Sequence, residues 1–240
     1  MANNYIYGRN TVFESLNANS VSKIFCRANM AMGKLKSIAE EKNIPIEIVS
    51  EQELNELSGN GVHQGVVGLI KPYQYEDLDV VISKAKSNPH PLIVMVAELN
   101  DPHNLGAIIR TCDAFSVDGI ILAKHRQVAV TPAVMKVATG AHNYVPVVQV
   151  TNLNQTANKL KEHGFWLVGT DLDTNTSYLS LEYDFPCVLV IGGEGWGVPS
   201  LLKKNCDYLV TIPQTGHVNS LNASVAAGIL IASIRGKQSL

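Results

Sequence analysis

Short apolar runs alternate with stretches of helical periodicity along the last two-thirds of the chain. The runs are almost continuously apolar, which is typical of strands that are buried on both faces of a parallel sheet. Helical patterns separate them, so the alternation predicts a layered α/β fold with right-handed crossovers. The predicted strands comprise residues 92–99, 119–123, 144–150, 165–169, 187–192 and 208–213. The predicted helices start near Asn104, Pro132, Asn152, Pro199 and Asn219.

A smaller α/β unit precedes this region and occupies residues 5–70. Hydrophobic periodicity and helix-start signals predict its elements. They are strands at 21–27, 44–50 and 63–70 and helices at 8–16, 30–42 and 51–57, the last of which is started by Ser50. Proline-bearing breaks then flank a helix at 78–86. We therefore predict a first domain of residues 1–75, a linker of residues 76–90 and a second domain of residues 91–240.

Composition limits the class of protein. The chain has 240 residues, of which 46% are hydrophobic and 17% charged, as expected of a globular protein. No run is long enough to span a membrane, and MANNYIYGRN lacks the apolar region of a signal peptide, so a cytoplasmic location is expected. Four widely spaced cysteines without a CxxC pair argue against structural zinc and a disulfide framework. A formal charge of −2 means that an RNA partner would have to be held by a local patch.

The first unusual segment is ELNDPHNLGAIIRTCDAF, residues 98–115. A strand ends there and a helix follows, with Asn104 and Arg110 both expected in its first two turns. The planar guanidinium of arginine fits phosphate or carboxylate. The alternative is an ordinary capped helix in which Arg110 pairs with a surface acid such as Asp113.

The second segment is VLVIGGEGWGVP, residues 188–199, with four glycines in six positions after a buried strand. Such glycines indicate that the backbone passes very near a ligand or another strand. The spacing differs from a Rossmann fingerprint, which disfavours a dinucleotide site. Glu194 stands among these glycines and either binds a ligand hydroxyl, orients Arg110, or faces water in a turn.

The third segment is IPQTGHVNSLNASVAAG, residues 212–228, in which an uncharged polar loop leads into an alanine-rich helix. Amide and hydroxyl side chains of this kind suit a polar ligand. Ser220 and Asn222 fall just before or within the first helical turn, where they act either on a ligand or simply as a cap. All three segments follow predicted strands, and ligands of parallel α/β folds bind at the carboxyl ends of strands. The seven histidines show no metal-binding pairing, so no metal site is expected.

In order and spacing, these segments resemble the three motifs of the SpoU/TrmH family of RNA ribose 2′-O-methyltransferases. The matching stretches are NDPHNLGAIIRT, IGGEGWGV and IPQTGHVNSLNASVAAGI. The first unit, with YGRNTVFESL and HQGVVGLI, is similar to the small L30e-like substrate-binding domain of the bacterial 23S ribosomal RNA guanosine-2′-O-methyltransferase subgroup. The resemblance covers the whole chain.

The resemblance implies a SPOUT fold, a parallel sheet whose C-terminal segment threads a deep trefoil knot. It also implies S-adenosylmethionine (SAM) as methyl donor, ribosomal RNA or transfer RNA as substrate, and a homodimer with its active site at the subunit interface. By motif match, the catalytic side chains are those of Asn104, Arg110, Glu194, Ser220 and Asn222. Backbone groups that hold the bent SAM fall at Gly192, Ile212 and Leu221.

The chemistry suits these residues. Arg110 would favour the alkoxide that develops when a ribose 2′-OH attacks the methyl group, and it can hold the neighbouring phosphate. Arginine barely deprotonates, so the base is left open between water and a phosphate oxygen. The other four side chains would orient the guanidinium, the ribose and the donor.

Ribosomal RNA methylation is the leading hypothesis, and transfer RNA is the nearest alternative substrate. A non-catalytic RNA-binding or assembly factor on the same fold is a second class of function. A nucleotide-dependent oxidoreductase is a third, which the glycine spacing disfavours.

Overall fold

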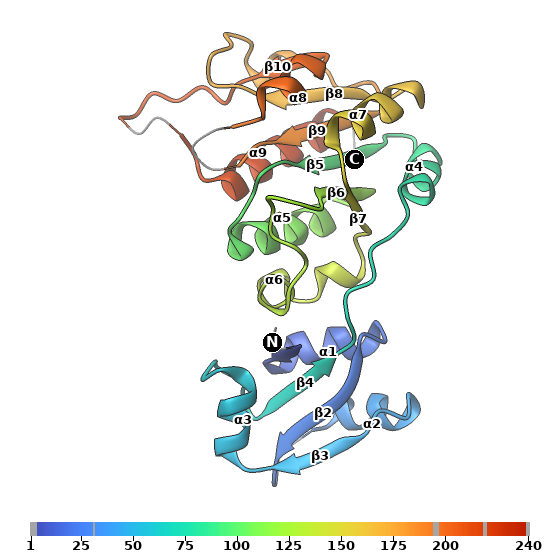
Figure 1. The fold of residues 1–240 in the computed structure, drawn as a ribbon, viewed down its shortest axis with the longest axis vertical. Coiled ribbons are helices and arrows are strands. Elements are labelled where there is room, and N and C mark those ends of the chain that lie inside the picture. Colours follow the sequence, from blue (N-terminus) through green and yellow to red (C-terminus); the bar gives the residue numbers. More distant parts are fainter. Residues whose placement is uncertain (1–3, 31, 194–196, 218–219, 239–240) are drawn as a thin grey trace. The chain divides into compact units, whose positions relative to one another are not determined.

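The computed structural model describes residues 4–30, 32–193, 197–217 and 220–238. The chain forms two compact units, each with its own sheet (Figure 1). The first unit comprises Met1–Gln74 together with Val130–Tyr144, and the second comprises Tyr75–Ala129 and Val145–Leu240. Contacts therefore group the segment 130–144 with residues that lie far before it in the chain.

The first unit is built on a mixed four-stranded sheet in the order β1-β4-β2-β3. β4 is antiparallel to β1 and β2, whereas β2 and β3 are parallel. The strands are β1 (Tyr5–Tyr7), β2 (Val21–Arg27), β3 (Ile46–Val49) and β4 (Val66–Ile70). The helices are α1 (Arg9–Asn17), α2 (Lys34–Glu41), α3 (Glu51–Ser58) and, from the later segment, α6 (Pro132–Ala138) with a 3-10 turn at Ala141–Asn143.

Local chemistry explains where two of these helices begin. The predicted start of α3 is confirmed, because Ser50 and Glu53 form a capping box. The prediction of a helix from residue 30 is wrong, because α2 begins only at Lys34. Gly33 precedes it with φ of 44°, in the left-handed region, which interrupts the helical backbone.

His142 is an unusual buried group of the first unit. Its side chain is 2% exposed, and neither ring nitrogen has a hydrogen-bond partner among the described residues. Tyr73 packs beside the ring, with the two centroids 6.4 Å apart. Burial disfavours the charged imidazolium and lowers the pKa of His142 to about 4.

We expect acid to destabilise the protein through His142. Its pKa is lower in the folded chain than in the unfolded one, so the unfolded chain binds more protons and stability falls as pH drops below 6.5. Between pH 7.5 and pH 5 the free energy of unfolding should fall by about 2 kcal/mol from this group. Calorimetry of wild type and His142→Leu at both pH values tests this, with the exposed His163→Leu as control. An equal acid sensitivity of wild type and His142→Leu would contradict it.

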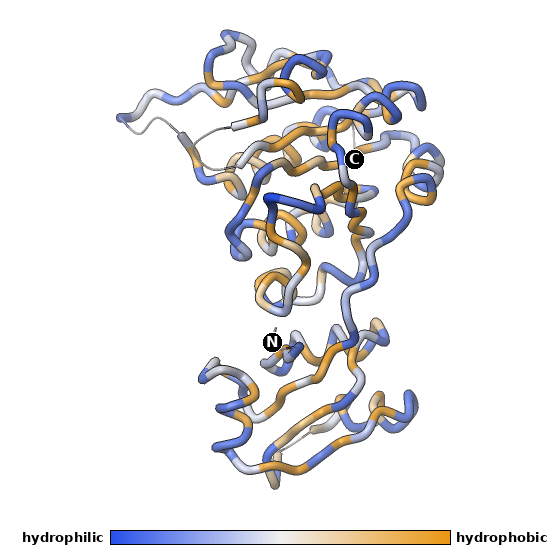
Figure 2. The backbone as a smooth tube through the Cα atoms, in the orientation of Figure 1, coloured by the Kyte–Doolittle hydropathy of each residue, from blue (hydrophilic) through white to orange (hydrophobic). Residues whose placement is uncertain are grey.

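The second unit is built on a six-stranded, entirely parallel sheet in the order β10-β8-β9-β5-β6-β7. The parallel α/β fold predicted from the alternating pattern is thus confirmed. The strands are β5 (Leu92–Val96), β6 (Gly119–Ala123), β7 (Val147–Val150), β8 (Trp166–Thr170), β9 (Cys187–Ile191) and β10 (Tyr208–Val210). The central strands β5 and β9 are buried at every position, which explains their continuous apolar runs (Figure 2).

Helices cover both faces of this sheet. The helices are α4 (Leu78–Lys86), α5 (Pro102–Ala114), α7 (Leu153–Glu162), α8 (Ser200–Asn205) and α9 (Ala223–Lys237), with a 3-10 turn at Tyr178–Ser180. Apolar side chains of α4, α7 and α8 share a core with alternate residues of β5, β8 and β9, such as Ile93, Leu167 and Val188. α5 and α9 pack against each other and against β6 and β9 respectively. None of the helices in the described ranges is long and apolar enough to cross a membrane.

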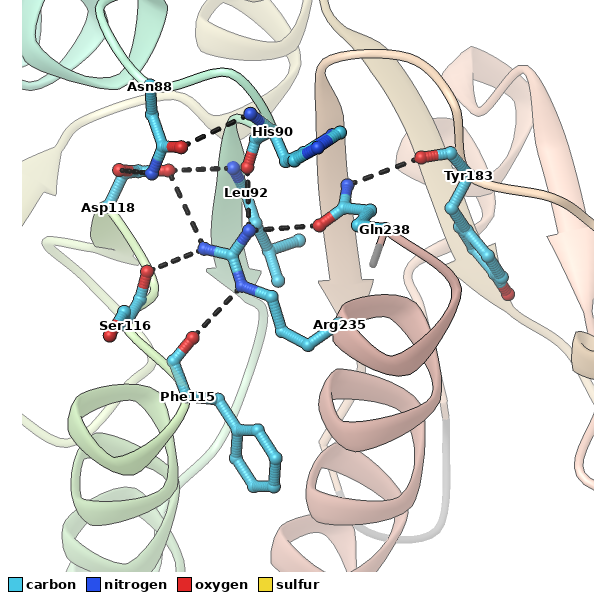
Figure 3. A network of polar contacts seen from close by, with 9 residues as sticks. All are labelled: Asn88, His90, Leu92, Phe115, Ser116, Asp118, Tyr183, Arg235 and Gln238. Atoms are coloured by element: carbon cyan, nitrogen blue, oxygen red, sulfur yellow. Dashed lines mark hydrogen bonds and ion pairs between the residues drawn. The ribbon is translucent and has the colours of Figure 1, made fainter. Parts of the chain in front are cut away.

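The end of α9 is fixed by Arg235, whose side chain is 4% exposed (Figure 3). Its guanidinium donates hydrogen bonds to the backbone oxygens of His90, Phe115 and Ser116 at 2.6, 2.9 and 2.5 Å. It also donates to Gln238 Oε1 at 2.9 Å and lies 3.9 Å from the Asp118 carboxylate. One side chain thereby ties the end of α9 to the end of α5 and to the segments that precede β5 and β6.

Candidate functional site

A cavity of about 630 Å³ lies in the second unit, where β8, β9 and β10 end. In a parallel sheet the carboxyl ends of neighbouring strands meet at one edge, so the loops that follow them converge there. The described residues of its wall come from the ends of these three strands, from the segments that follow them, from α8 and from the beginning of α9. They are Thr170, Asp171, Leu172 and Asp173; Ile191, Gly192, Gly193, Gly197, Val198 and Lys203; Val210, Thr211, Ile212 and Gln214; and Ser220, Leu221, Asn222, Ala223 and Ala226.

The glycines after β9 are required by close backbone approach. A Cβ at Gly192 would lie 2.0 Å from the Gly197 carbonyl carbon, and one at Gly193 would lie 2.2 Å from the Glu98 oxygen. Gly193 and Gly197 also face each other in an antiparallel bridge. The close backbone approach expected from the sequence is found at these residues, within the loop itself and against the segment that follows β5, whereas the expectation named a ligand or another strand. Glu194, the carboxylate proposed among them, lies outside the described residues.

The third segment forms the cap of α9. Asn222 is the N-cap residue, and its Oδ1 accepts hydrogen bonds from the backbone N–H groups of Ser224 and Val225 at 2.9 and 3.3 Å. Its amide nitrogen donates to Asn104 Oδ1 at 2.9 Å. Asn104 is 5% exposed on α5, so this bond joins the first and third segments across 118 residues. Ser220 is exposed and lines the cavity beside Asn222.

The α5 helix begins two residues earlier than predicted, because Asp101 caps it and Pro102 occupies its first position. Arg110 is consequently its ninth residue, in the third turn, and the expectation that it lies in the first two turns is wrong. Six residues rotate a helix by about 240°, so Arg110 and Asn104 leave α5 in different directions. Arg110 is exposed, is absent from the described cavity wall, and makes no ion pair with Asp113.

The three backbone positions proposed for the cofactor, Gly192, Ile212 and Leu221, all lie in the cavity wall. They come from the loop after β9 and from the segment that joins β10 to α9. The structure therefore brings them together with Ser220 and Asn222 in one chain, while Asn104 stands behind Asn222.

Sequence reasoning missed a charged pair in the wall. The Lys203 ammonium donates to Asp171 Oδ1 at 2.8 Å, and the Asp173 backbone N–H donates to the same oxygen at 3.2 Å. Burial acts to raise the pKa of the Asp171 carboxyl, but these hydrogen bonds and the charge of Lys203 together hold it below its ordinary value. Their signal was available, because Asp171 lies two residues after the end of the predicted strand 165–169, at the edge where ligands bind.

The histidines stay apart from this cavity wall. His103 is exposed in the first turn of α5, and His217 is exposed in the loop before α9. In the described parts of the chain, no three His, Cys, Asp or Glu side chains gather as a metal site would require. The four cysteines are free thiols, and three of them are buried.

Comparison with known proteins agrees with this architecture. Residues 91–232 match the SpoU rRNA methylase family, and residues 5–76 match the RNA 2′-O ribose methyltransferase substrate-binding family. The chain belongs to the SpoU rRNA methylase family. By this membership it is a SpoU methyltransferase, and the family expected from the three motifs is confirmed.

Relatives of the SpoU methyltransferase resemble it over two thirds or more of its length. A protein of Staphylococcus haemolyticus named "Putative TrmH family tRNA/rRNA methyltransferase" is 42% identical, over 97% of this chain and 95% of its own. The SpoU methyltransferase AviRb from Streptomyces viridochromogenes, solved with its cofactor AdoMet, has a TM-score of 0.81 at 23% identity and covers 97% of this chain and 89% of its own. The "A. aeolicus TrmH/SpoU tRNA modifying enzyme" has a TM-score of 0.57 at 29% identity and covers 67% of this chain and 81% of its own.

Proposed function

We propose that the protein transfers a methyl group from SAM to a ribose 2′-OH of structured RNA, with a guanosine of 23S ribosomal RNA as its target. The observation that carries the proposal is the cavity where the second and third motifs meet, backed by the Asn104–Asn222 hydrogen bond. A non-catalytic assembly factor would have no need of this arrangement. The AdoMet-bound structures of AviRb and of the Sinorhizobium meliloti rRNA methyltransferase have the same fold.

The residues of the cavity fit SAM. A volume of about 630 Å³ is of the size that holds a nucleoside-sized ligand. Gly192, Ile212 and Leu221 contribute backbone groups to a largely neutral wall, which suits adenine and ribose. When bound, SAM supplies an electrophilic methyl group on its sulfonium.

The side chains then act on the RNA. Arg110 stabilises the negative charge that grows on the 2′ oxygen and binds the adjacent phosphate. Asn222, held by its bond to Asn104, orients the ribose with Ser220 and Glu194. Arginine is a poor proton acceptor, so the 2′-OH proton leaves to water or to a phosphate oxygen.

A homodimer would complete this site. Arg110 is exposed and absent from the described wall of its own chain's cavity, so in our proposal it serves the cavity of a second copy. The exposed apolar Leu221 and Val225 at the start of α9, which packs beside α5, support an interface there. A two-fold axis would give two equivalent shared sites.

The roles that we propose for the two domains follow the two family matches. In our proposal residues 1–75 dock the RNA, residues 76–90 link the domains, and residues 91–240 hold SAM and form the SPOUT domain with its trefoil knot. The choice of ribosomal RNA rests on the resemblance of the first unit to the substrate-binding domain of the 23S ribosomal RNA subgroup, and the S. haemolyticus relative is named for both tRNA and rRNA. Such a substrate agrees with a cytoplasmic location.

Mapping 2′-O-methyl groups tests the proposal. Deleting the gene should remove methylation at one guanosine of 23S ribosomal RNA, and the wild-type gene should restore it whereas an Asn222→Ala gene should not. Loss from a transfer RNA instead would overturn the choice of substrate. The purified protein should bind SAM and not NAD in calorimetry, and the reverse result would favour an oxidoreductase.

A further inference from the structure

The charge of the described cavity wall is confined to one region, the loop after β8 together with α8, which is its charged side; the neutral loops after β9 and β10 flank β8 in the sheet. Of the described wall residues, Asp171, Asp173 and Lys203 are charged, and all of them lie at the end of β8 or on α8. The remaining described lining residues are neutral, including Gly192, Ile212 and the residues around Asn222. A ligand with one charged and one neutral end would therefore bind in a single orientation.

The Asp171–Lys203 ion pair holds this charged side of the cavity in place. The two side chains are 11% and 30% exposed, and their 2.8 Å hydrogen bond links the loop after β8 to α8. An ammonium has three N–H donors, and the bond to Asp171 uses one of those of Lys203. Lys203 is the one cation in the described cavity wall, so it is the natural partner there for an anionic group.

SAM has such an anionic group at one end. Its adenine and ribose are neutral, whereas its methionine end carries a carboxylate and an ammonium. Burying a charged group is costly unless a partner of opposite charge receives it. We propose that Lys203 binds the carboxylate of the methionine end of SAM, and that Asp171 is the positioning residue that holds the Lys203 ammonium toward the cavity.

This proposal rests on the proposed SAM-dependent function and adds the orientation of the cofactor. The adenosine end then occupies the neutral side, against Gly192, Ile212 and Leu221. Lys203 contributes equally to the binding of SAM and of the product S-adenosylhomocysteine, because both ligands carry the same carboxylate. It contributes nothing to 5′-methylthioadenosine, which has the adenosine and the sulfur but no amino-acid end.

Calorimetric titration of the full-length protein with these three ligands tests the inference. Lys203→Met should weaken the binding of SAM and of S-adenosylhomocysteine by about tenfold or more, the usual range for losing a hydrogen bond to a charged group. The affinity for 5′-methylthioadenosine should change by no more than about twofold, because this ligand has no carboxylate for Lys203 to bind. Lys203→Arg should restore most of the loss, since it keeps a cationic donor.

Lys204→Met is the matched control, because Lys204 is exposed on the same helix and does not line the cavity. Asp171→Asn is a second variant, in which the side chain keeps nearly the same shape. It should weaken the binding of S-adenosylhomocysteine but not the binding of 5′-methylthioadenosine. If Lys203→Met lost the same affinity for all three ligands, or lost no affinity for SAM, the proposed role of Lys203 would be overturned. A wild-type protein that binds none of the three would instead refute the proposed function itself.

Discussion

Replacing Arg110 with alanine is expected to lower the rate of methyl transfer by about a hundredfold or more while leaving SAM affinity nearly unchanged. The guanidinium acts on the charge that develops on the attacking oxygen, so its contribution appears in the transition state and not in donor binding. Its exposure and its absence from the described wall of its own chain's cavity agree with this separation. Single-turnover rates and calorimetric SAM titrations measure the two effects independently.

Arg126→Ala is a suitable control, because Arg126 is an exposed arginine of the same unit outside the three motifs. Arg110→Lys should also be slow, since lysine keeps the charge but loses the planar fork. Methylation by Arg110→Ala at a near-normal rate would contradict the assigned role.

Mixing subunits extends this test to the dimer. If Arg110 and Asn222 serve one site from opposite subunits, a dimer of one Arg110→Ala chain and one Asn222→Ala chain contains one intact site. Such a mixture should recover activity that neither parent variant has. A monomer that is fully active at nanomolar concentration would exclude the shared site.

Replacing Arg235 with methionine is expected to lower the free energy of unfolding by about 3–5 kcal/mol. The substitution keeps an apolar stem but leaves the backbone carbonyl oxygens of His90, Phe115 and Ser116, which are part-buried in these hydrogen bonds, without their donor (Figure 3). Asp118 would keep its bonds from Asn88 Nδ2 at 3.0 Å and from the Leu92 N–H at 2.8 Å. The loss should therefore come mainly from the unsatisfied carbonyls.

Urea denaturation followed by circular dichroism measures this effect, with the exposed Lys204→Met as control, expected to change stability by about 0.5 kcal/mol or less. The free energy of unfolding of Arg235→Lys should lie between those of the wild type and Arg235→Met, because one ammonium cannot reach all the acceptors that the planar guanidinium contacts. An Arg235→Met protein as stable as the wild type would show that the network contributes little to folding.

The sequence by itself determined most of the elements and the family. Continuous apolar runs such as residues 92–96 and 187–191 are dictated by burial on both faces, so the parallel sheet was predictable. Helix starts are set by local chemistry, and Ser50 and Asn152 act as the N-caps of α3 and α7. The three motifs, read in order, identified the SpoU family. They also indicated the proposed cofactor positions, which the structure brings into one cavity wall.

Only the tertiary structure decided which distant residues meet. The Asn104–Asn222 bond, the Asp171–Lys203 pair and the buried Arg235 network all join segments far apart in sequence. Periodicity along a chain indicates which face of an element is buried, but it says nothing about which other element covers that face. The grouping of residues 130–144 with the first unit depends on such packing, so it had no signal in the local pattern.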